Sequence, residues 1–90
     1  MYALRHSSKI KKDLKTCQKR QYDMSLFEEV VKKLRIPELL EPKHRDHKLS
    51  GRLEKYRECH ITPDWVLIYR YDGECLEVVR TGTHADLFNM

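Results

Sequence analysis

The 90-residue sequence lacks the marks of membrane proteins and of disulfide-bonded secreted proteins. It has no apolar run near the roughly 20 residues that a membrane-spanning helix needs, so we expect no membrane partner. Its three cysteines are widely spaced and form no CxxC pair, which is a poor framework for disulfides or for zinc. Residues 1–12 are charged throughout and lack the apolar segment of a signal peptide. We therefore expect a cytoplasmic protein with reduced cysteines.

Glycine is also scarce, and the glycine-rich motifs of several enzyme classes are missing. The three glycines form no GxGxxG fingerprint, no phosphate-binding P-loop and no GxSxG nucleophile elbow. Dinucleotide, nucleoside-triphosphate and serine-hydrolase chemistry therefore have no support. With 40% apolar and 36% charged residues the chain is still expected to be globular, and its length suits a single domain over residues 1–90.

What the sequence does have is positive charge concentrated at its start. Residues 1–20 hold seven lysines and arginines against one acid, a net charge of +6. Residues 21–90 hold eleven against thirteen, a net charge of −2, so the two parts sum to the formal +4 of the chain. A basic segment can follow nucleic-acid phosphates or receive an acidic protein partner, and it is equally compatible with a solvated helix face. Charge alone leaves the function open.

The first third of the chain predicts a strand followed by two helices. Met1–Arg5 suits a short strand, and a basic helix follows with Ser7 or Ser8 as its N-cap. The apolar stripe of this helix is narrow and consists of Ile10, Leu14 and Cys17. A second helix with a wider stripe starts near residues 23–25, where Ser25 and Glu28 have capping-box spacing. The short connection between them predicts an antiparallel helical hairpin.

The remainder predicts three strands and a closing helical turn. The polar stretch 42–51 has no period and is expected to be a loop. Strand-like composition covers three segments: Lys55–Ile61, Trp65–Tyr71 and Cys75–Thr81. Asp72-Gly73 predicts a type I′ hairpin turn, and Thr83 can cap a helical turn that holds His84. The sum is an α+β fold of β-α-α-β-β-β order, with one antiparallel sheet and the N-terminal helical hairpin packed on one face.

Histidines in the C-terminal half are the candidates for chemistry. His47, His60 and His84 fall at loop or strand-end positions, and Asp64 lies in the turn after His60. An imidazole, with an unperturbed pKa of about 6.5, can act as a base toward a ribose 2′-hydroxyl or as an acid toward a leaving 5′-oxygen. Cations that can stabilise phosphate charge flank them: Lys48, Arg52, Lys55, Arg57 and Arg80. Tyr56 and Trp65 offer flat faces for stacking of RNA bases.

Other interpretations of these residues remain open on spacing alone. His6 and His44 are expected to be ordinary surface histidines, Trp65 and Tyr56 are compatible with a core, and Asp64 with a plain turn. A metal site built from the histidines and Cys59 matches no standard zinc spacing.

Four segments resemble the YafQ-type members of the RelE toxin superfamily. Residues 46–51 (DHKLSG) are similar to their DHxLxG loop, and residues 56–65 (YRECHITPDW) to their YRxxHxxPDW segment. Residues 67–69 (LIY) and 80–88 (RTGTHADLF) resemble their LIY strand and their closing RTGTHxxLF. The segments occur in the family's order and spacing, over about half of the chain. The helical half resembles the family only in pattern.

The resemblance implies a ribosome-dependent endoribonuclease toxin that cuts mRNA in the ribosomal A site, needs no metal or other cofactor, and is neutralised by a cognate antitoxin. It matches four positions to active-site residues: His47, His60, Asp64 and His84. It matches three to supporting residues: Trp65, Arg80 and Phe88. We expect His84 to protonate the leaving oxygen, His60 or His47 to act as base, and Arg80 to hold the phosphate. Asp64 is expected to orient an imidazole or contact RNA. Glu58 and Cys59 lie in a variable part of the motif, so their roles stay open.

Two other functions remain as alternatives. The first is a non-catalytic RNA- or ribosome-binding module that blocks translation by occupancy. The second, with less support, is a metal-dependent hydrolase.

Overall fold

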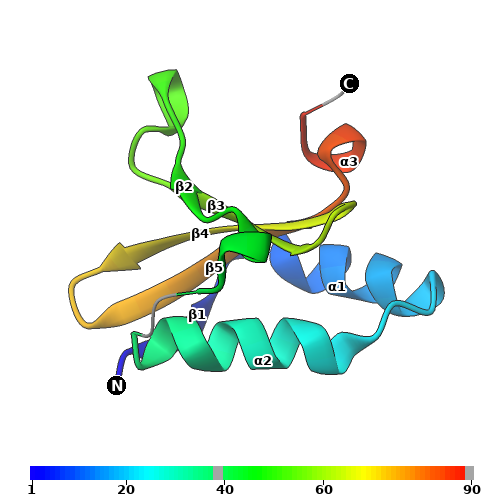
Figure 1. Ribbon diagram of the computed structural model, residues 1–90, viewed down its shortest axis with the longest axis horizontal. Helices are drawn as coiled ribbons and strands as arrows, with labels where there is room; N and C mark the ends of the chain where they lie inside the picture. The colour runs from blue at the N-terminus through cyan, green and yellow to red at the C-terminus, as the bar shows by residue number, and fades with distance from the viewer. Residues whose placement is uncertain (38–39, 89–90) are drawn as a thin grey trace.

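The helical hairpin and the strands predicted from the sequence form in the computed structural model, which describes residues 1–37 and 40–88. Over these residues, three helices and five strands make an α+β fold of two layers (Figure 1). The helices are α1 (Ile10–Lys19), α2 (Met24–Arg35) and α3 (His84–Phe88). The strands are β1 (Ala3–His6), β2 (His47–Lys48), β3 (Arg57–Thr62), β4 (Trp65–Asp72) and β5 (Cys75–Gly82). None of these helices has the length and apolarity needed to cross a membrane.

The sheet is mixed, and this corrects the prediction of a wholly antiparallel sheet. Its strand order is β1-β5-β4-β3-β2, and β2 to β5 are antiparallel neighbours as predicted. β1 instead pairs parallel with β5, from Ala3 opposite Cys75 to His6 opposite Val78. The apolar pattern of a strand records which face is buried but not the direction of its neighbour, so this pairing could not be predicted from the sequence.

Helices α1 and α2 cover one face of the sheet, as Figure 1 shows. Their apolar stripes meet the side chains of Cys59, Ile61, Trp65, Leu67 and Tyr69 in one core. Because successive side chains of a strand point to opposite faces, Glu58 and His60 of β3 point away from the helices. The helix α3 lies on that same far side of the sheet, and β2 is the edge strand next to β3 (Figure 1). The core therefore occupies one face and leaves the other for a site.

The predicted caps are partly correct. Ser7 accepts a hydrogen bond from the backbone N–H of Ile10 at the start of α1, but the N-cap residue is Lys9, which makes no side-chain cap. At α2, however, Asp23 is the N-cap and accepts from the N–H of Ser25, so the capping box from Ser25 is wrong. The carboxylate two residues earlier reaches the free amides of the first turn, and the helix begins before Ser25.

The segment predicted as a plain loop is structured. Residues 42–51 contain the 3₁₀ helix η1 (Pro42–His44) and the strand β2, and a second 3₁₀ helix, η2 (Gly51–Leu53), follows. β2 pairs with β3 through His47 opposite Glu58 and Lys48 opposite Arg57. A strand of two residues is too short to show an alternating apolar pattern in the sequence. It forms because the edge of β3 is open for pairing, which only the tertiary structure shows.

The β4–β5 hairpin turn forms one residue later than predicted. Asp72 pairs with Cys75, so Gly73 and Glu74 are the two loop residues. Gly73 has a positive φ of 59° and Glu74 does not, so the turn is not type I′, which needs positive φ at both positions. Glycine at the first loop position is what the observed turn requires.

Candidate active site

Three histidines converge on one buried carboxylate. The Nε2 atoms of His84, His60 and His47 lie 3.2, 3.4 and 3.7 Å from Oε1 of Glu58. The Glu58 side chain is 5% exposed, whereas those of His84 and His47 are 37% and 51% exposed. The carboxylate therefore sits at the floor of the cluster, and two imidazoles stand at its open side.

The fold brings these residues together from three separate elements. Glu58 and His60 are two residues apart on β3 and so share a face. The pairing of β2 with β3 places His47 directly opposite Glu58. His84 begins α3 immediately after β5, and Phe88 on the same helix stacks on its ring with centroids 5.8 Å apart.

Helix α3 is fixed at both its start and its side. Asp86 donates its N–H to Oγ1 of Thr83, and Thr83 donates its N–H to Oδ2 of Asp86, which confirms the predicted cap. Arg20, the C-cap residue of α1, donates two hydrogen bonds to the same carboxylate, at 2.6 and 3.0 Å, and holds the pKa of Asp86 well below its usual range. A short helix with such anchors can hold the imidazole of His84 in place.

Backbone carbonyls orient two of the imidazoles. Nδ1 of His47 lies 2.7 Å from the carbonyl oxygen of Arg45, and Nδ1 of His60 lies 3.4 Å from that of Pro63. A carbonyl oxygen only accepts hydrogen bonds, so Nδ1 of each ring is the donor. Nε2, on the Glu58 side, is then the nitrogen that can take up or release a proton.

Glu58 is the residue that sequence reasoning missed. It lies in the variable part of the family motif, so the resemblance assigned it no role. One signal was available, because Glu58 and His60 are separated by one residue in a segment predicted to be a strand and therefore had to share a face. The other two contacts depend on β2 and α3 and could not be predicted from that pattern.

Arg80 is already engaged by another part of the chain. Its Nε and Nη2 atoms donate to the carboxylate of Asp13 on α1 at 2.6 and 3.1 Å. The contact raises the pKa of the guanidinium, which stays charged. Asp13 also accepts from the backbone N–H of Thr81. Only the remaining nitrogen, Nη1, is left without a hydrogen bond to Asp13 for a phosphate.

Trp65 lies in the core rather than at a surface where bases stack. It is 2% exposed, its indole N–H donates to Oγ1 of Thr81, and Tyr22 and Phe27 pack against its ring. The proposed stacking of RNA bases on Trp65 therefore does not fit the structure. The ring is large and apolar, and the free energy of burying it exceeds that of exposing it for stacking.

Asp64 is exposed in the turn between β3 and β4. Within residues 1–37 and 40–88, no hydrogen bond or ion pair joins it to a histidine. The expectation that Asp64 orients an imidazole therefore finds no support in these contacts, and its contact with RNA stays a prediction.

The remaining predicted contacts with RNA lie at or near the surface. Lys48, Arg52 and Lys55 are exposed. Arg57 is half-buried and pairs with Asp46 at 3.3 Å, and Arg70 lies over the ring of Tyr56, 5.9 Å from its centroid. The three lysine and arginine side chains that are exposed are the ones available to phosphates.

Two further expectations concern His44 and the cysteines. His44 is 8% exposed, so the expectation of an ordinary surface histidine is wrong. Cys17 and Cys59 are buried and Cys75 is half-buried, and all three are free thiols in the structure. Burial raises the pKa of the Cys59 thiol, which makes it a poor nucleophile.

The cluster also has the donor set of a transition-metal site. One ligand atom each from Glu58, His60 and His84 lies within 4.8 Å of the others. Tetrahedral ligands at about 2.0–2.1 Å from a metal stand roughly 3.3 Å apart, which is close to the spacings of the two nitrogens from Glu58 given above. Carboxylate and imidazole donors suit zinc, copper or nickel. A metal bound here would occupy the nitrogen lone pairs that proton transfer needs.

Residues 2–89 match the family model described as "Bacterial toxin of type II toxin-antitoxin system, YafQ". The chain belongs to the YafQ toxin family. The mRNA interferase toxin YafQ of Escherichia coli strain K12 is 40% identical over 86 residues, which are 94% of each protein. The structural resemblance also extends over nearly the whole chain, both to a YafQ structure and to a DinJ–YafQ complex.

The structure of YafQ from E. coli strain BL21(DE3) has a TM-score of 0.90 at 36% identity, covering 98% of this chain and 99% of that one. The E. coli DinJ–YafQ toxin–antitoxin complex gives 0.88 at 38% identity, with 97% of each chain covered. A metal-bound toxin from Helicobacter pylori gives 0.92 at 40% identity, covering 98% and 100%. These findings confirm the family and the fold that the motifs predicted.

Proposed function

We propose that this protein is an mRNA interferase, an endoribonuclease that cuts mRNA in the ribosomal A site and is neutralised by a cognate antitoxin. The convergence of three imidazole Nε2 atoms on the Glu58 carboxylate carries the proposal. This arrangement offers an acid and a base at neutral pH within one cluster. The relative named mRNA interferase toxin YafQ is 40% identical to this chain, and a YafQ structure shares its fold.

In the proposed reaction, His60 or His47 removes the proton of a 2′-hydroxyl, and the 2′-oxygen attacks the adjacent phosphorus. The bond from phosphorus to the 5′-oxygen breaks as His84 protonates that oxygen. The products are a 2′,3′-cyclic phosphate and a 5′-hydroxyl. Glu58 holds the protonated imidazole in place, and no step needs a metal. Arg80, kept in place by Asp13, supplies positive charge to the phosphate.

The RNA contacts are assigned to exposed groups. Lys48 and Arg52 follow the phosphates beside the cluster, and Phe88 supports the ring of His84. Asp64 is proposed to contact RNA rather than orient an imidazole, because its carboxylate stands apart from the histidines.

The test is to map mRNA ends after incubation with translating ribosomes. We expect cuts at one position of the A-site codon, with 5′-hydroxyl and 2′,3′-cyclic or 3′-phosphate ends. EDTA treatment of the purified toxin should leave the rate unchanged, and ribosome-free mRNA should be cut weakly or not at all. Translation that stops with intact mRNA would instead support a module that blocks the ribosome by occupancy. Activity that is lost with EDTA and restored by one equivalent of zinc would indicate a metal-dependent hydrolase.

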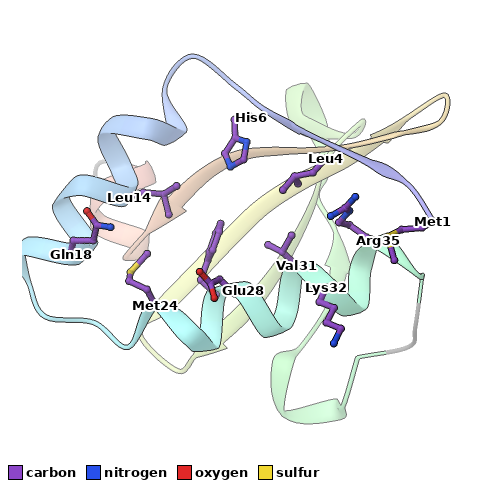
Figure 2. A pocket seen from close by; sticks show the side chains of 11 residues that line it. Met1, Leu4, His6, Leu14, Gln18, Met24, Glu28, Val31, Lys32 and Arg35 are labelled. Atoms are coloured by element: carbon purple, nitrogen blue, oxygen red, sulfur yellow. The ribbon is translucent and has the colours of Figure 1, made fainter.

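We further propose that an acidic amphipathic segment of the antitoxin binds a groove on the helix side of the molecule. β1, α1 and α2 form this groove, which is shown in Figure 2. Its apolar lining includes Leu4, Leu14, Met24, Phe27 and Val31, and Lys32 and Arg35 lie at its rim with one acid, Glu28. The excess of positive charge in residues 1–20 complements an acidic partner. The groove lies across the sheet from the cluster of His47, His60 and His84, so an antitoxin bound there leaves these side chains uncovered and neutralises the toxin by keeping it from the ribosome.

Substitutions in the groove are expected to weaken antitoxin binding and spare cleavage. Leu14→Glu should raise the Kd by more than tenfold, because it places a charge on the apolar lining. Lys32→Glu should raise it by a smaller, salt-dependent factor, whereas Lys43→Glu, which makes the same charge change outside the groove, should not. Calorimetry with the purified antitoxin measures the Kd of each of these three variants. Unchanged affinity in Leu14→Glu and Lys32→Glu together would place the antitoxin elsewhere.

A further inference from the structure

His44 is a buried histidine that the proposed chemistry does not use. It ends η1, three residues before His47, and is 8% exposed. Its Nδ1 atom lies 2.7 Å from the backbone carbonyl oxygen of His60. Because that oxygen only accepts, Nδ1 of His44 is the donor. The contact holds in the neutral ring and in the protonated ring alike, so it is a permanent link between η1 and β3.

The hydrogen bond from His44 takes the place of a backbone hydrogen bond that β2 is too short to give to β3. In an antiparallel strand, alternate residues direct both backbone groups to the same side. The carbonyl of Tyr56 faces the β2 side, where it accepts from the N–H of Leu49, so Glu58 and His60 face that side too. The pairing of β2 with β3 ends at His47 opposite Glu58. The next outward carbonyl, that of His60, is therefore met by the side chain of His44 instead of a strand.

A short chain of contacts runs from this link to the imidazole of His47. Arg45 has a left-handed backbone, with φ 48°, and donates its N–H to the carbonyl of Pro42. Its own carbonyl accepts from Nδ1 of His47 at 2.7 Å. The opposite nitrogen of that ring, Nε2, lies 3.7 Å from Oε1 of Glu58. The position of Arg45 therefore decides which way the His47 ring faces.

Asp46 provides a second anchor on the other side of Arg45. Its carboxylate accepts from the hydroxyl of Tyr69 at 2.5 Å and from Nε of Arg57 at 3.3 Å. His44 thus holds one side of the turn against β3, and Asp46 holds the other side against β3 and β4. Asp46 belongs to the family's DHxLxG motif, whereas His44 lies outside it. An exposed segment with a left-handed residue needs such anchors to keep one conformation.

We infer that His44 is a positioning residue: its Nδ1–H fixes the turn of residues 44–47 against β3 and thereby sets the imidazole of His47 beside Glu58. The inference rests on the proposed function for its kinetic consequences. It goes beyond that function by assigning the orientation of His47 to a side chain that touches neither RNA nor another imidazole of the cluster.

Three substitutions separate positioning from simple packing. His44→Asn keeps a donor nitrogen the same number of bonds from the backbone, His44→Gln moves it one bond outward, and His44→Leu removes it at similar volume. A displacement of about 1 Å in a catalytic group can cost about 100-fold in rate. We expect kcat to fall 10- to 100-fold in His44→Leu and His44→Gln with KM changed less than threefold. His44→Asn should stay within threefold of the wild type.

A double-mutant cycle with His47→Ala tests whether His44 acts through His47. If it does, His44→Leu should cost little once His47 is absent, because the two effects are not additive. An equal loss in both backgrounds would overturn the inference, and so would an unchanged kcat in His44→Leu and His44→Gln. Loss of rate in His44→Asn equal to that in His44→Leu would also overturn it. Should His44→Leu fail to fold, His44→Gln carries the same cycle.

Nitrogen-15 NMR of the histidine rings gives a readout that does not depend on cleavage. In the wild type and His44→Asn, we expect His47 to show a slowly exchanging Nδ1–H. In His44→Gln that signal should broaden or disappear while the backbone spectrum of β3 to β5 is retained. An unchanged His47 signal in His44→Gln would contradict the inference. Absence of ribonuclease activity in the wild type would contradict the proposed function and leave the NMR result to decide on His44 alone.

Discussion

His84→Ala is expected to lower the single-turnover rate of mRNA cleavage on programmed ribosomes by about 10²- to 10⁴-fold, the usual contribution of a positioned acid or base. The side chain stands at the open side of the cluster, 37% exposed and 3.2 Å from Glu58, where it can reach a leaving oxygen. Antitoxin binding and thermal stability should change little, because α3 keeps its cap and its Arg20–Asp86 ion pair. His6→Ala, at an exposed histidine at the end of β1, is the matched control for the cleavage rate but not for antitoxin binding, because His6 lines the groove.

The chemical role of His84 can be tested separately from its importance. An mRNA with sulfur in place of the bridging 5′-oxygen has a leaving group that departs without protonation. If His84 is the general acid, His84→Ala should cut this substrate at nearly the wild-type rate, whereas variants of the base should not. Equal rates for His84→Ala and the wild type on ordinary mRNA would end the assignment. If His84→Ala cuts both the ordinary and the sulfur-substituted mRNA much more slowly than the wild type, His84 has a role other than general acid.

Glu58→Gln is expected to reduce kcat by about 10²- to 10⁴-fold without lowering stability. An amide in place of a buried carboxylate beside a catalytic histidine removes the charge that stabilises the protonated ring and changes its hydrogen bonding; such a change costs about 10⁴-fold in serine proteases.

The stability of Glu58→Gln distinguishes a catalytic role from a structural one. A carboxylate that is 5% exposed carries a desolvation cost, so a neutral isostere should leave the free energy of unfolding equal or higher. Glu54→Gln makes the same change on an exposed side chain and should alter neither rate nor stability. If Glu58→Gln retains wild-type kcat, the histidines do not depend on the carboxylate. If it unfolds instead, the carboxylate is mainly a structural anchor.

The strands β3, β4 and β5, both long helices and the capped turn of His84 were predictable because each depends on residues close in sequence. The family motif placed His47, His60 and His84 in one site without showing how they meet. Trp65 shows the limit of the sequence, since a flat ring in a strand-like segment is equally compatible with stacking on RNA and with packing in the core.

What the sequence determined by itself is the set of elements, the apolar face of each and the identity of the histidines. The tertiary structure alone decided the parallel pairing of β1, the existence of β2, the meeting of the imidazoles at Glu58 and the anchoring of the turn by His44. The physical reason is the range of the interactions. Periodicity and caps act over one turn or a few residues, whereas the Arg80–Asp13 pair joins residues 67 apart in the chain. Such contacts form only once the sheet has set which strands and helices are neighbours.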